Sequence, residues 1–529
     1  MDSKITSASE AVALIKAGST VLVDGSGGGV NQPDALLQAI AQRFESSGDL
    51  YDLTIVHPSG LGDGLGGGVD RLATQGLVKR VVGGHWGWTP RMQELALNEK
   101  IEAYCLPQGV ISHLMRETAA GRPGVVTKVG LYTACDPRLE GGRLNRTAKA
   151  DLVEVVTLRG QEWLLYKSFP IDVAIIKASF ADERGNLCMD HEGLAAEVLS
   201  AAQAAKNSGG VVIAQVPFVV EAYSIDPRRV KVPGILVDAV AVAPDSRLSA
   251  ATAADPTLTG DARASRALVA PTPLTERTVI ARRAAAELRT GDVVNLGYGM
   301  PDGVATALAV EGLTDEVTLT VEQGHIGGTP ASGTDFGLVR NAEATVDAGY
   351  QFDFYDGGGL DIAVLSFAQV GRTGDVNVSR FGNRMPGVGG FINISHGAKR
   401  VVFVGTMTTA KGGYRFAPDG VTVPAGAPKL VAEVEQVSFS ARAALERGQT
   451  VLYVTERAVF ELTADGLVLV EVAPGLDPGT DVIAQMEFEP VVADDLRRSD
   501  SRLYVQNSLG YLAEHLALHN GHPDTEENR

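Results

Sequence analysis

Cysteine is scarce in this chain of 529 residues. Its three cysteines stand far apart, at Cys105, Cys135 and Cys188. They are too few and too scattered for a disulfide framework or a zinc site. We therefore expect buried free thiols, which suit a reducing cytosol, and no bound metal. His515 and His519 are four residues apart on a helical pattern, but no acidic or cysteine ligand set accompanies them.

Long hydrophobic runs and an excess of positive charge are also missing. No apolar segment reaches the length of a membrane span, and residues 1–7 are polar, without a signal-peptide core. The formal net charge is −18, a sign that repels nucleic acids and anionic membranes. The sequence thus predicts a soluble cytoplasmic protein that binds neither nucleic acid nor membrane. A small anionic ligand would need a local basic or backbone-amide site.

Complete nucleotide-binding motifs are absent as well. Gly25-x-Gly27-x-x-Val30 lacks the third small residue, and Gly297-x-Gly299-x-x-Asp302 has a proline at the helix start. Neither completes G-x-G-x-x-G, and the chain has no Walker sequence, so a Rossmann NAD site is disfavoured. Backbone amides at the helix starts after these loops can still hold an anion or a substrate carboxylate.

What the chain does contain is glycine, aliphatic residues and an internal repeat. Its 61 glycines and 45% apolar content suit α/β domains with buried aliphatic strands. The first half reads helix, strand, glycine loop, helix, and the second half repeats this order. Deeper in each half, a strand begins at Asp172 or Asp361, and Gly185 or Gly374 follows 13 residues later. Matching elements are predicted at 20–24 and 292–296, 172–176 and 361–365, and 210–214 and 400–404.

The repeat predicts an α/β fold of two similar tandem domains. Strands that alternate with helices indicate mainly parallel sheets flanked by helices. We expect domains at residues 1–245 and 275–519, with an active site in the cleft between them. Residues 246–274, rich in Ala, Ser, Thr, Asp and Pro, are predicted to be a linker without a core of its own. Residues 520–529 are expected to be a disordered tail.

Glu322 is the most informative residue of the chain. The β-favouring residues 318–321 predict a strand, and Gly324, Gly327 and Gly328 predict the loop that follows it. A carboxylate at the tip of a parallel strand faces a substrate bound over the sheet edge. The alternative is a turn glutamate that faces water. His325 is close enough in sequence to orient Glu322, while His57, after a first-half strand, either lines the cleft or is structural.

Three further segments have unusual composition. In Tyr350–Asp361, aromatic residues alternate with carboxylates before three glycines, which indicates close backbone approach or a core strand with a tight turn. Gly387-Val-Gly-Gly-Phe391 is a loop in which consecutive amides can converge on one oxygen. Pro107-Gln108-Gly109 offers a side-chain amide near a turn.

Taken together, these segments resemble the class I coenzyme A-transferases, in the acetate/propionate subgroup, with two subunits fused in one chain. The resemblance extends from about residue 5 to 515. The set of motifs is specific as a whole, although no single one is. The motifs are Gly291–Pro301, Glu322-x-Gly324, Gly327-Gly328, Tyr350–Asp361, Asn377–Gly382, Gly387–Phe391, Gly83–Trp86, Leu106–Ser112 and Thr127–Leu131.

The resemblance implies roles for individual residues. It makes Glu322 the nucleophile, places oxyanion-hole amides at Gly389 and Gly390, and uses Gln108 to complete the site. It also implies glycines that let substrate approach: Gly297, Gly299, Gly324, Gly327, Gly328 and Gly387. The chain departs from the family pattern at Gln323, Gly371 and Asp375, which bears on substrate fit more than on the nucleophile.

The activity implied is transfer of CoA from a short-chain acyl-CoA to a free carboxylate such as acetate or propionate. It would follow ping-pong kinetics through a glutamyl-CoA thioester. Coenzyme A is then a cosubstrate, no cofactor is tightly bound, and the enzyme is a homodimer or homotetramer. An acyl-CoA hydrolase is the first alternative, and a non-catalytic CoA or metabolite sensor is the second. A sensor needs no nucleophile, so Glu322 argues against it.

Overall fold

The computed structural model describes residues 3–265, 272–506 and 509–520, which form two compact units. Unit 1 comprises Met1–Ala264, Val321–Asp356 and Ser379–Asn393, and unit 2 comprises Ser265–Thr320, Gly357–Val378 and Ile394–Arg529. Segments of the second half of the sequence, including Glu322 and the 387–390 turn, therefore belong to the unit built on the first half. The domain boundaries suggested by the repeat stay a prediction.

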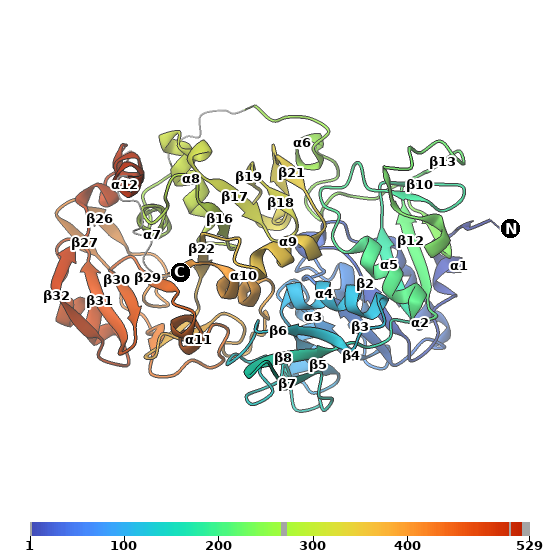
Figure 1. Ribbon diagram of the computed structural model, residues 1–529, viewed down its shortest axis with the longest axis horizontal. Coiled ribbons are helices and arrows are strands. Elements are labelled where there is room, and N and C mark those ends of the chain that lie inside the picture. The colour runs from blue at the N-terminus through green and yellow to red at the C-terminus, as the bar shows by residue number, and fades with distance from the viewer. Residues whose placement is uncertain (1–2, 266–271, 507–508, 521–529) are drawn as a thin grey trace. The chain divides into compact units, whose positions relative to one another are not determined.

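A fully parallel sheet forms the centre of unit 1 (Figure 1). Its strand order is β1-β15-β12-β9-β2-β3-β4-β5. The strands are β1 Ile5–Thr6, β15 Ala239–Val242, β12 Val211–Val216, β9 Val173–Lys177, β2 Thr20–Val23, β3 Leu53–His57, β4 Val78–Gly83 and β5 Glu102–Cys105. Every residue of β9 is buried, because both faces of the sheet are covered.

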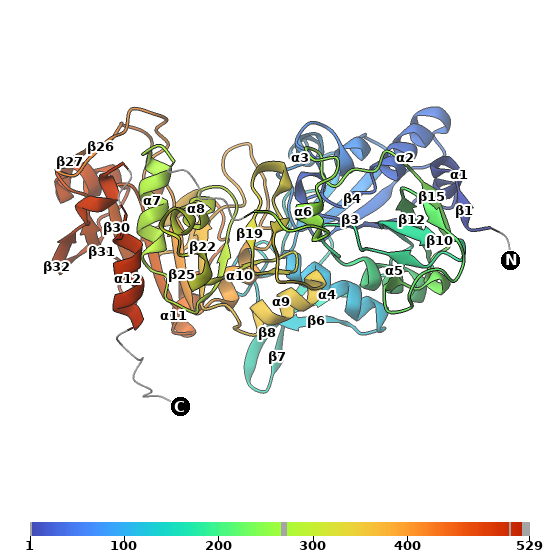
Figure 2. The ribbon, with the colours of Figure 1, turned by 90° about the horizontal axis from the view of Figure 1, so that it is seen from above.

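Helices cover both faces of this sheet, with α2 and α3 on one side and α4 and α5 on the other (Figure 2). The helices are α1 Ala8–Val12, α2 Asp34–Ser47, α3 Pro90–Leu97, α4 Gln108–Ala119, α5 Val198–Asn207, α6 Pro256–Thr259 and α9 Ala348–Asp356. Local chemistry sets their ends: α1 begins with a capping box between Ser7 and Glu10, and α2 ends at the left-handed Gly48.

Unit 1 also contains smaller sheets and short strand pairs. One has the order β13-β10-β11-β14, a second is the antiparallel β6-β8-β7, and short antiparallel pairs join β18 to β21 and β19 to β20. Their bounds are β6 Gly124–Thr127, β7 Val153–Leu158, β8 Gln161–Lys167, β10 Phe180–Asp182, β11 Leu187–Cys188, β13 Val219–Val220, β14 Val230–Val232, β18 His325–Ile326, β19 Thr329–Pro330, β20 Val339–Arg340 and β21 Ala344–Thr345.

Unit 2 contains a mixed sheet whose strands run in the order β17-β16-β22-β25-β29-β30-β31-β32. Neighbours from β17 to β29 are parallel, β30 is antiparallel to both β29 and β31, and β32 is parallel to β31. The strands are β16 Val293–Leu296, β17 Thr318–Val321, β22 Ile362–Ser366, β25 Arg400–Val404, β29 Thr450–Val454, β30 Ala458–Thr463, β31 Gly466–Val472 and β32 Val491–Arg498.

The remaining elements of this half are short. The helices are α7 Glu276–Ala285, α8 Asp302–Glu311, α10 Phe391–Gly397, α11 Ala441–Glu446 and α12 Tyr511–Asn520. The strands are β23 Gln369–Gly371, β24 Val376–Asn377, β26 Arg415–Ala417, β27 Gly420–Thr422 and β28 Leu430–Val431. The last residue of β17, Val321, already belongs to unit 1.

The internal repeat and the α/β fold class are confirmed by strand order. In unit 1 the order β12-β9-β2-β3 matches β25-β22-β16-β17 of unit 2, strand for strand. The strand pairs that the sequence aligned by their glycine loops therefore hold equivalent positions in the parallel parts of the two sheets. The buried aliphatic pattern of each strand, repeated at the same spacing, accounts for the agreement.

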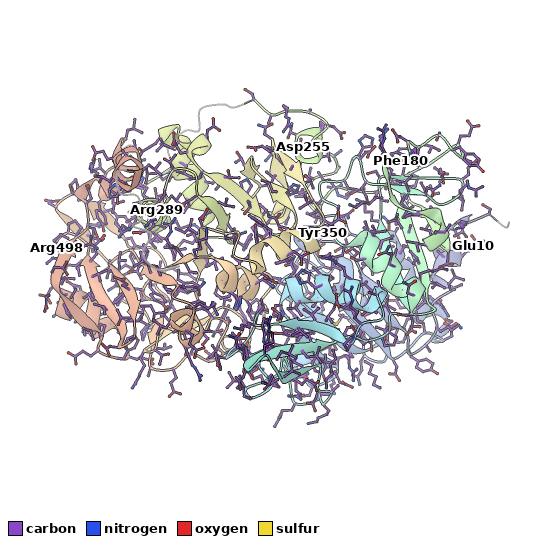
Figure 3. The ribbon with its side chains drawn as sticks, in the orientation of Figure 1. Glu10, Phe180, Asp255, Arg289, Tyr350 and Arg498 are labelled. Atoms are coloured by element: carbon purple, nitrogen blue, oxygen red, sulfur yellow. The ribbon has the colours of Figure 1, made fainter. Side chains whose placement is uncertain are left out.

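One sequence-based alternative is wrong, and the predicted linker stays a prediction. The strand alternative for residues 350–361 fails, because residues 348–356 form helix α9, on which Figure 3 labels Tyr350. Alternation of aromatic and acidic residues misled the prediction, since the buried Phe352 and Tyr355 are three apart and share one helix face. The predicted linker also has packed residues: Leu248 and Leu258 are buried in one cluster with Leu338.

The structure bears on several other expectations. All three cysteines are free and buried, as predicted. Within the described residues, no group of three or more His, Cys, Asp or Glu side chains is arranged to hold a metal ion. Among the same residues, no helix is both long and apolar enough to cross a membrane. Asn520 ends α12, and the rest of the predicted tail, 521–529, lies outside the described residues, as does the side chain of His519.

The burial of β2 predicts a large effect of a core substitution. Leu22→Ala removes a side chain that is 1% exposed, and should lower the free energy of unfolding by about 2–5 kcal/mol. Leu158→Ala, at a strand residue that is 44% exposed, is the matched control and should cost less than about 1 kcal/mol. Urea unfolding of both variants measures the difference. Equal losses would contradict this assignment of the core.

Candidate functional site

The site is built at the carboxyl edge of the parallel sheet in unit 1. From β2 the chain proceeds to β3, β4 and β5 on one side, while β9, β12 and β15 extend the sheet on the other. The strand order thus reverses between β2 and β9, the position at which open α/β sheets bind ligands. Asp24 and the glycine-rich segment 25–29 directly follow β2 at this point.

Glu322 directly follows β17, whose bounds are those predicted from the sequence. Its side chain is 6% exposed, so the alternative of a turn glutamate facing water is wrong. Gly324 reverses the chain at once: its amide donates to Val321, and its carbonyl accepts from Val346, both at 2.9 Å. With φ at 121°, and no room for a Cβ beside the Val346 carbonyl, only glycine fits there.

Gln323 has a role that sequence reasoning missed. Its Nε2 donates a hydrogen bond to Oε1 of Glu322 at 3.2 Å, and its side chain is buried beside the carboxylate. From the sequence, this residue stands out only as a departure from the family pattern. A side-chain amide next to the glutamate is the signal that could have revealed it, because the amide can donate a hydrogen bond to a carboxylate oxygen.

The histidines near the strand ends are neutral and bonded locally. His325 is 2% exposed, burial lowers its pKa to about 4, and its Nδ1 lies 3.1 Å from Oγ1 of Thr345. His57, the last residue of β3, has Nδ1 2.5 Å from the Ser59 carbonyl oxygen, and burial likewise lowers its pKa to about 4. The structural interpretation of His57 is therefore favoured over the cleft-lining one.

The glycines after Glu322 have a structural reason of their own. A Cβ atom at Gly327 would meet the Glu343 side chain, and one at Gly328 would overlap the Arg340 carbonyl oxygen. These glycines let the paired segments β18–β21 and β19–β20 approach each other closely. A role for them in substrate binding stays a prediction.

The turn at residues 387–390 lies against the first-half sheet within unit 1. His85 forms a β-bridge with Gly387, and the Gly389 amide donates to the Gly84 carbonyl at 2.7 Å. Since that amide is already bonded, it does not point to a ligand in this conformation. Among the described residues, the Gly390 amide donates no hydrogen bond, so Gly390 is the better placed of the two predicted oxyanion-hole donors.

Gln108 is brought to this turn. It is the first residue of α4, is 3% exposed, and its backbone amide donates to the Gly389 carbonyl at 2.9 Å. The next amide, of Gly109, donates to Oδ1 of Asn393 at 3.1 Å. The structure therefore joins two of the predicted site segments, the start of α4 and the 387–390 turn, through backbone hydrogen bonds.

Gly297 and Gly299 belong to unit 2. The Gly297 amide donates to the Val364 carbonyl at 2.9 Å, and the Gly299 amide donates to Oδ2 of Asp302 at 3.3 Å. Burial raises the pKa of Asp302 to about 6. Both amides thus donate to protein groups, one in the neighbouring strand β22 and one in the loop itself, and a contact of these glycines with substrate stays a prediction.

A buried carboxyl pair was missed by sequence reasoning. Asp24 is 1% exposed and Glu197 is 4% exposed; the Glu197 amide donates to Oδ1 of Asp24 at 3.3 Å. Ser112, on α4, hydrogen-bonds the Glu197 carboxylate and lies 3.2 Å from the Gln108 carbonyl. Burial raises the pKa of both carboxyls, and repulsion from Glu197 adds to this for Asp24, so the pair keeps a proton to higher pH than ordinary carboxyls do.

This carboxyl pair predicts a specific pH dependence of stability. A raised pKa in the folded state means that folding binds a proton, so stability falls as pH rises from the ordinary carboxyl range through the raised pKa. The slope reaches about 1.4 kcal/mol per pH unit for one proton. Asp24→Asn should flatten this fall, measured by urea unfolding from about pH 5 to about pH 9. The exposed Asp245→Asn is the control, and a parallel loss in all three proteins would contradict the shared proton.

Comparison with known proteins identifies the family. A family model for coenzyme A transferase matches residues 5–243. The chain is 45% identical over 511 residues to caffeate CoA-transferase of Acetobacterium woodii, covering 95% of this chain and 97% of that protein. It is 40% identical over 511 residues to acetate CoA-transferase YdiF of Escherichia coli O157:H7, covering 96% of each.

Solved structures agree with the sequence matches. The crystal structure of acyl-CoA transferase YdiF apoenzyme from the same bacterium superposes with a TM-score of 0.91 at 39% identity. It covers 96% of this chain and 97% of that chain. An α/β fold that matches such a protein over 96% of this chain is the fold of an acyl-CoA enzyme. The chain belongs to the coenzyme A transferase family: it is a CoA-transferase, and CoA is its cosubstrate.

Proposed function

We propose that this enzyme transfers CoA from a short-chain acyl-CoA to a free carboxylate of the acetate or propionate type, through a glutamyl-CoA thioester on Glu322. The observation that supports it is the buried Glu322 carboxylate, bonded to Gln323 and followed by the Gly324 turn. A second crystal structure of YdiF from E. coli O157:H7, also with a TM-score of 0.91, is described as a thioester complex with CoA.

The proposed reaction begins with attack on the acyl-CoA. A Glu322 oxygen bonds to the acyl carbonyl carbon, the carbonyl π electrons move to oxygen, and collapse breaks the C–S bond to release CoA thiolate. The mixed anhydride that results is attacked at the glutamyl carbonyl by the thiolate. The first acid leaves as a carboxylate, and Glu322 becomes a CoA thioester. An incoming carboxylate reverses these steps, so no net proton is consumed.

Each step places negative charge on a carbonyl oxygen, and hydrogen-bond donors aimed at that oxygen lower the barrier. The Gly390 amide and the Gln108 side chain are the proposed donors. Anhydride formation from a thioester is uphill, so binding of the long CoA chain has to offset it. The burial of Glu322 supports exclusion of water from the anhydride, which separates transfer from hydrolysis.

Removal of the nucleophile should abolish transfer. Glu322→Ala should show no detectable transfer from propionyl-CoA to acetate, measured by chromatography of the acyl-CoA products. Its circular dichroism should match that of the wild type. Glu45→Ala, at an exposed glutamate of α2, is the matched control and should keep full activity. Full activity of the Glu322→Ala protein would sink the mechanism.

The covalent intermediate can be identified directly. Incubation with propionyl-CoA followed by borohydride should reduce the Glu322 thioester to an alcohol, which peptide mass spectrometry would locate. Comparison of acetate, propionate and caffeate as acceptors would then define the acid class. Loss of propionyl-CoA at the same rate with and without acetate, and without a modified Glu322, would instead indicate hydrolysis.

The reach of the Glu322 side chain is a separate prediction. Glu322→Asp withdraws the carboxylate by one methylene, and a misplacement of about 1 Å can cost about 10²-fold in rate. We expect kcat to fall at least that far, while the dissociation constant for CoA changes little. Steady-state kinetics and equilibrium binding measure the two effects. A kcat close to that of the wild type would show that attack does not need the glutamate's length.

The proposed assembly rests on the family resemblance, and the proposed location rests on the sequence. We propose a homodimer or homotetramer, which light scattering of the full chain distinguishes from a monomer. A cytoplasmic location remains a prediction of the sequence, and fractionation of cells that produce the protein would check it.

A further inference from the structure

His85 lies beside the 387–390 turn and has no role in the mechanism so far. It follows β4 in the Gly83-Gly-His-Trp86 motif and pairs with Gly387 in a β-bridge. The adjacent Trp86 amide donates a second hydrogen bond to this segment, to the Pro386 carbonyl at 2.6 Å. All of these residues belong to unit 1. The ring is therefore held next to the turn by backbone hydrogen bonds on both sides.

Glycines surround the imidazole ring. A Cβ atom built at Gly60 would lie 2.6 Å from Nδ1, and one at Gly87 would lie 2.6 Å from Cε1. Across the ring, a Cβ at Gly389 would lie 3.6 Å from Cδ2. The absence of side chains at Gly60 and Gly87 makes room for the ring, whose Cδ2 atom lies nearest to Gly389 of the turn.

The hydrogen bonds assign the tautomer of His85. The Gly87 amide donates to Nδ1 at 3.2 Å, so Nδ1 carries no proton. Burial, with a smaller contribution from His57, lowers the pKa of His85 to about 4, so the ring is neutral near pH 7 and its proton is on Nε2. Within the described part of the chain, Nε2 donates to no protein group.

Such a donor would add to the Gly390 amide and the Gln108 side chain proposed above. The amide of Gly389 is bonded to Gly84, which leaves the Gly390 amide as the available backbone donor at this turn. Stabilising an oxyanion generally takes two or more donors. A neutral imidazole N–H can fill that position without adding a charge that would have to be buried.

We propose that His85 is a further catalytic residue, whose Nε2–H donates a hydrogen bond to the thioester carbonyl oxygen as that oxygen gains negative charge. The proposal rests on the function proposed above for Glu322. No proton is transferred: charge develops on the oxygen when the Glu322 oxygen bonds to the carbonyl carbon, and it leaves with the CoA sulfur. His85 is neutral before and after the step.

Two variants of similar volume separate the donor from the packing. His85→Leu removes the N–H and should lower kcat by about 10²–10³ with little change in KM, because the bond strengthens in the transition state. His85→Gln keeps an N–H donor and should recover much of that loss. His191→Leu, at an exposed histidine bonded to Asp261, is the control and should leave kcat unchanged.

A spectroscopic measurement tests the contact itself. The infrared stretch of a ¹³C-labelled acyl-CoA carbonyl, bound to the Glu322→Gln protein to prevent turnover, should shift to lower frequency than in water. Addition of His85→Leu to that protein should remove most of the shift. An unchanged shift, or a kcat of His85→Leu close to that of the wild type, would overturn the proposal.

A measurement on the wild-type protein covers the case in which His85→Leu does not fold. Nitrogen NMR of ¹⁵N-histidine-labelled enzyme, with His85 assigned by its absence in His85→Gln, should show the proton on Nε2. A proton on Nδ1 would overturn the proposal. Borohydride trapping distinguishes the two levels: a normal thioester at Glu322 with no His85 effect refutes only the role of His85, whereas no thioester in the wild type refutes the mechanism on which it rests.

Discussion

Much of the site depends on the two backbone hydrogen bonds of Gly389. Its amide donates to Gly84, beyond β4, and its carbonyl accepts from Gln108, at the start of α4. A residue from the second half of the sequence is thereby built into the sheet edge of the first half. The positions of His85, Gln108 and the Gly390 amide relative to one another all follow from this clamp, because each is adjacent to one end of a Gly389 bond.

Burial without excess charge is the second constraint. Unit 1 buries carboxyl groups at Asp24, Glu197 and Glu322, in surroundings from which water is largely excluded. Asp24 and Glu197 reduce the cost by holding a proton, and Glu322 by accepting from Gln323. The nearby rings of His57, His85 and His325 are neutral for the same reason, which suits them to donate or pack and not to act as cations.

The internal repeat explains why the parallel parts of the two sheets share one strand order. The residues that follow equivalent strands nevertheless differ in their chemistry. The equivalent of β17 and Glu322 in the first half is β3, followed by Pro58 after His57. His57 is bonded to its own loop, so that half presents no carboxylate at this position. The first half contributes instead the start of α4 and the loop after β4. The two halves of the sequence thus contribute different groups, with the proposed nucleophile in one and the proposed hydrogen-bond donors largely in the other.

The sequence by itself determined the strand, loop and helix units and the candidate nucleophile. Strand β17 and the start of α8 lie where they were predicted, because aliphatic runs, prolines and glycines act on neighbours within a few residues. Tertiary structure alone decided that the Gly389 amide is occupied, that Asp24 meets Glu197, and that His85 faces the turn. The bonded partners Asp24 and Glu197 are 173 residues apart, and no local pattern encodes so distant a pairing. Which donors surround a carbonyl depends on chain segments that meet only when the whole sheet has formed.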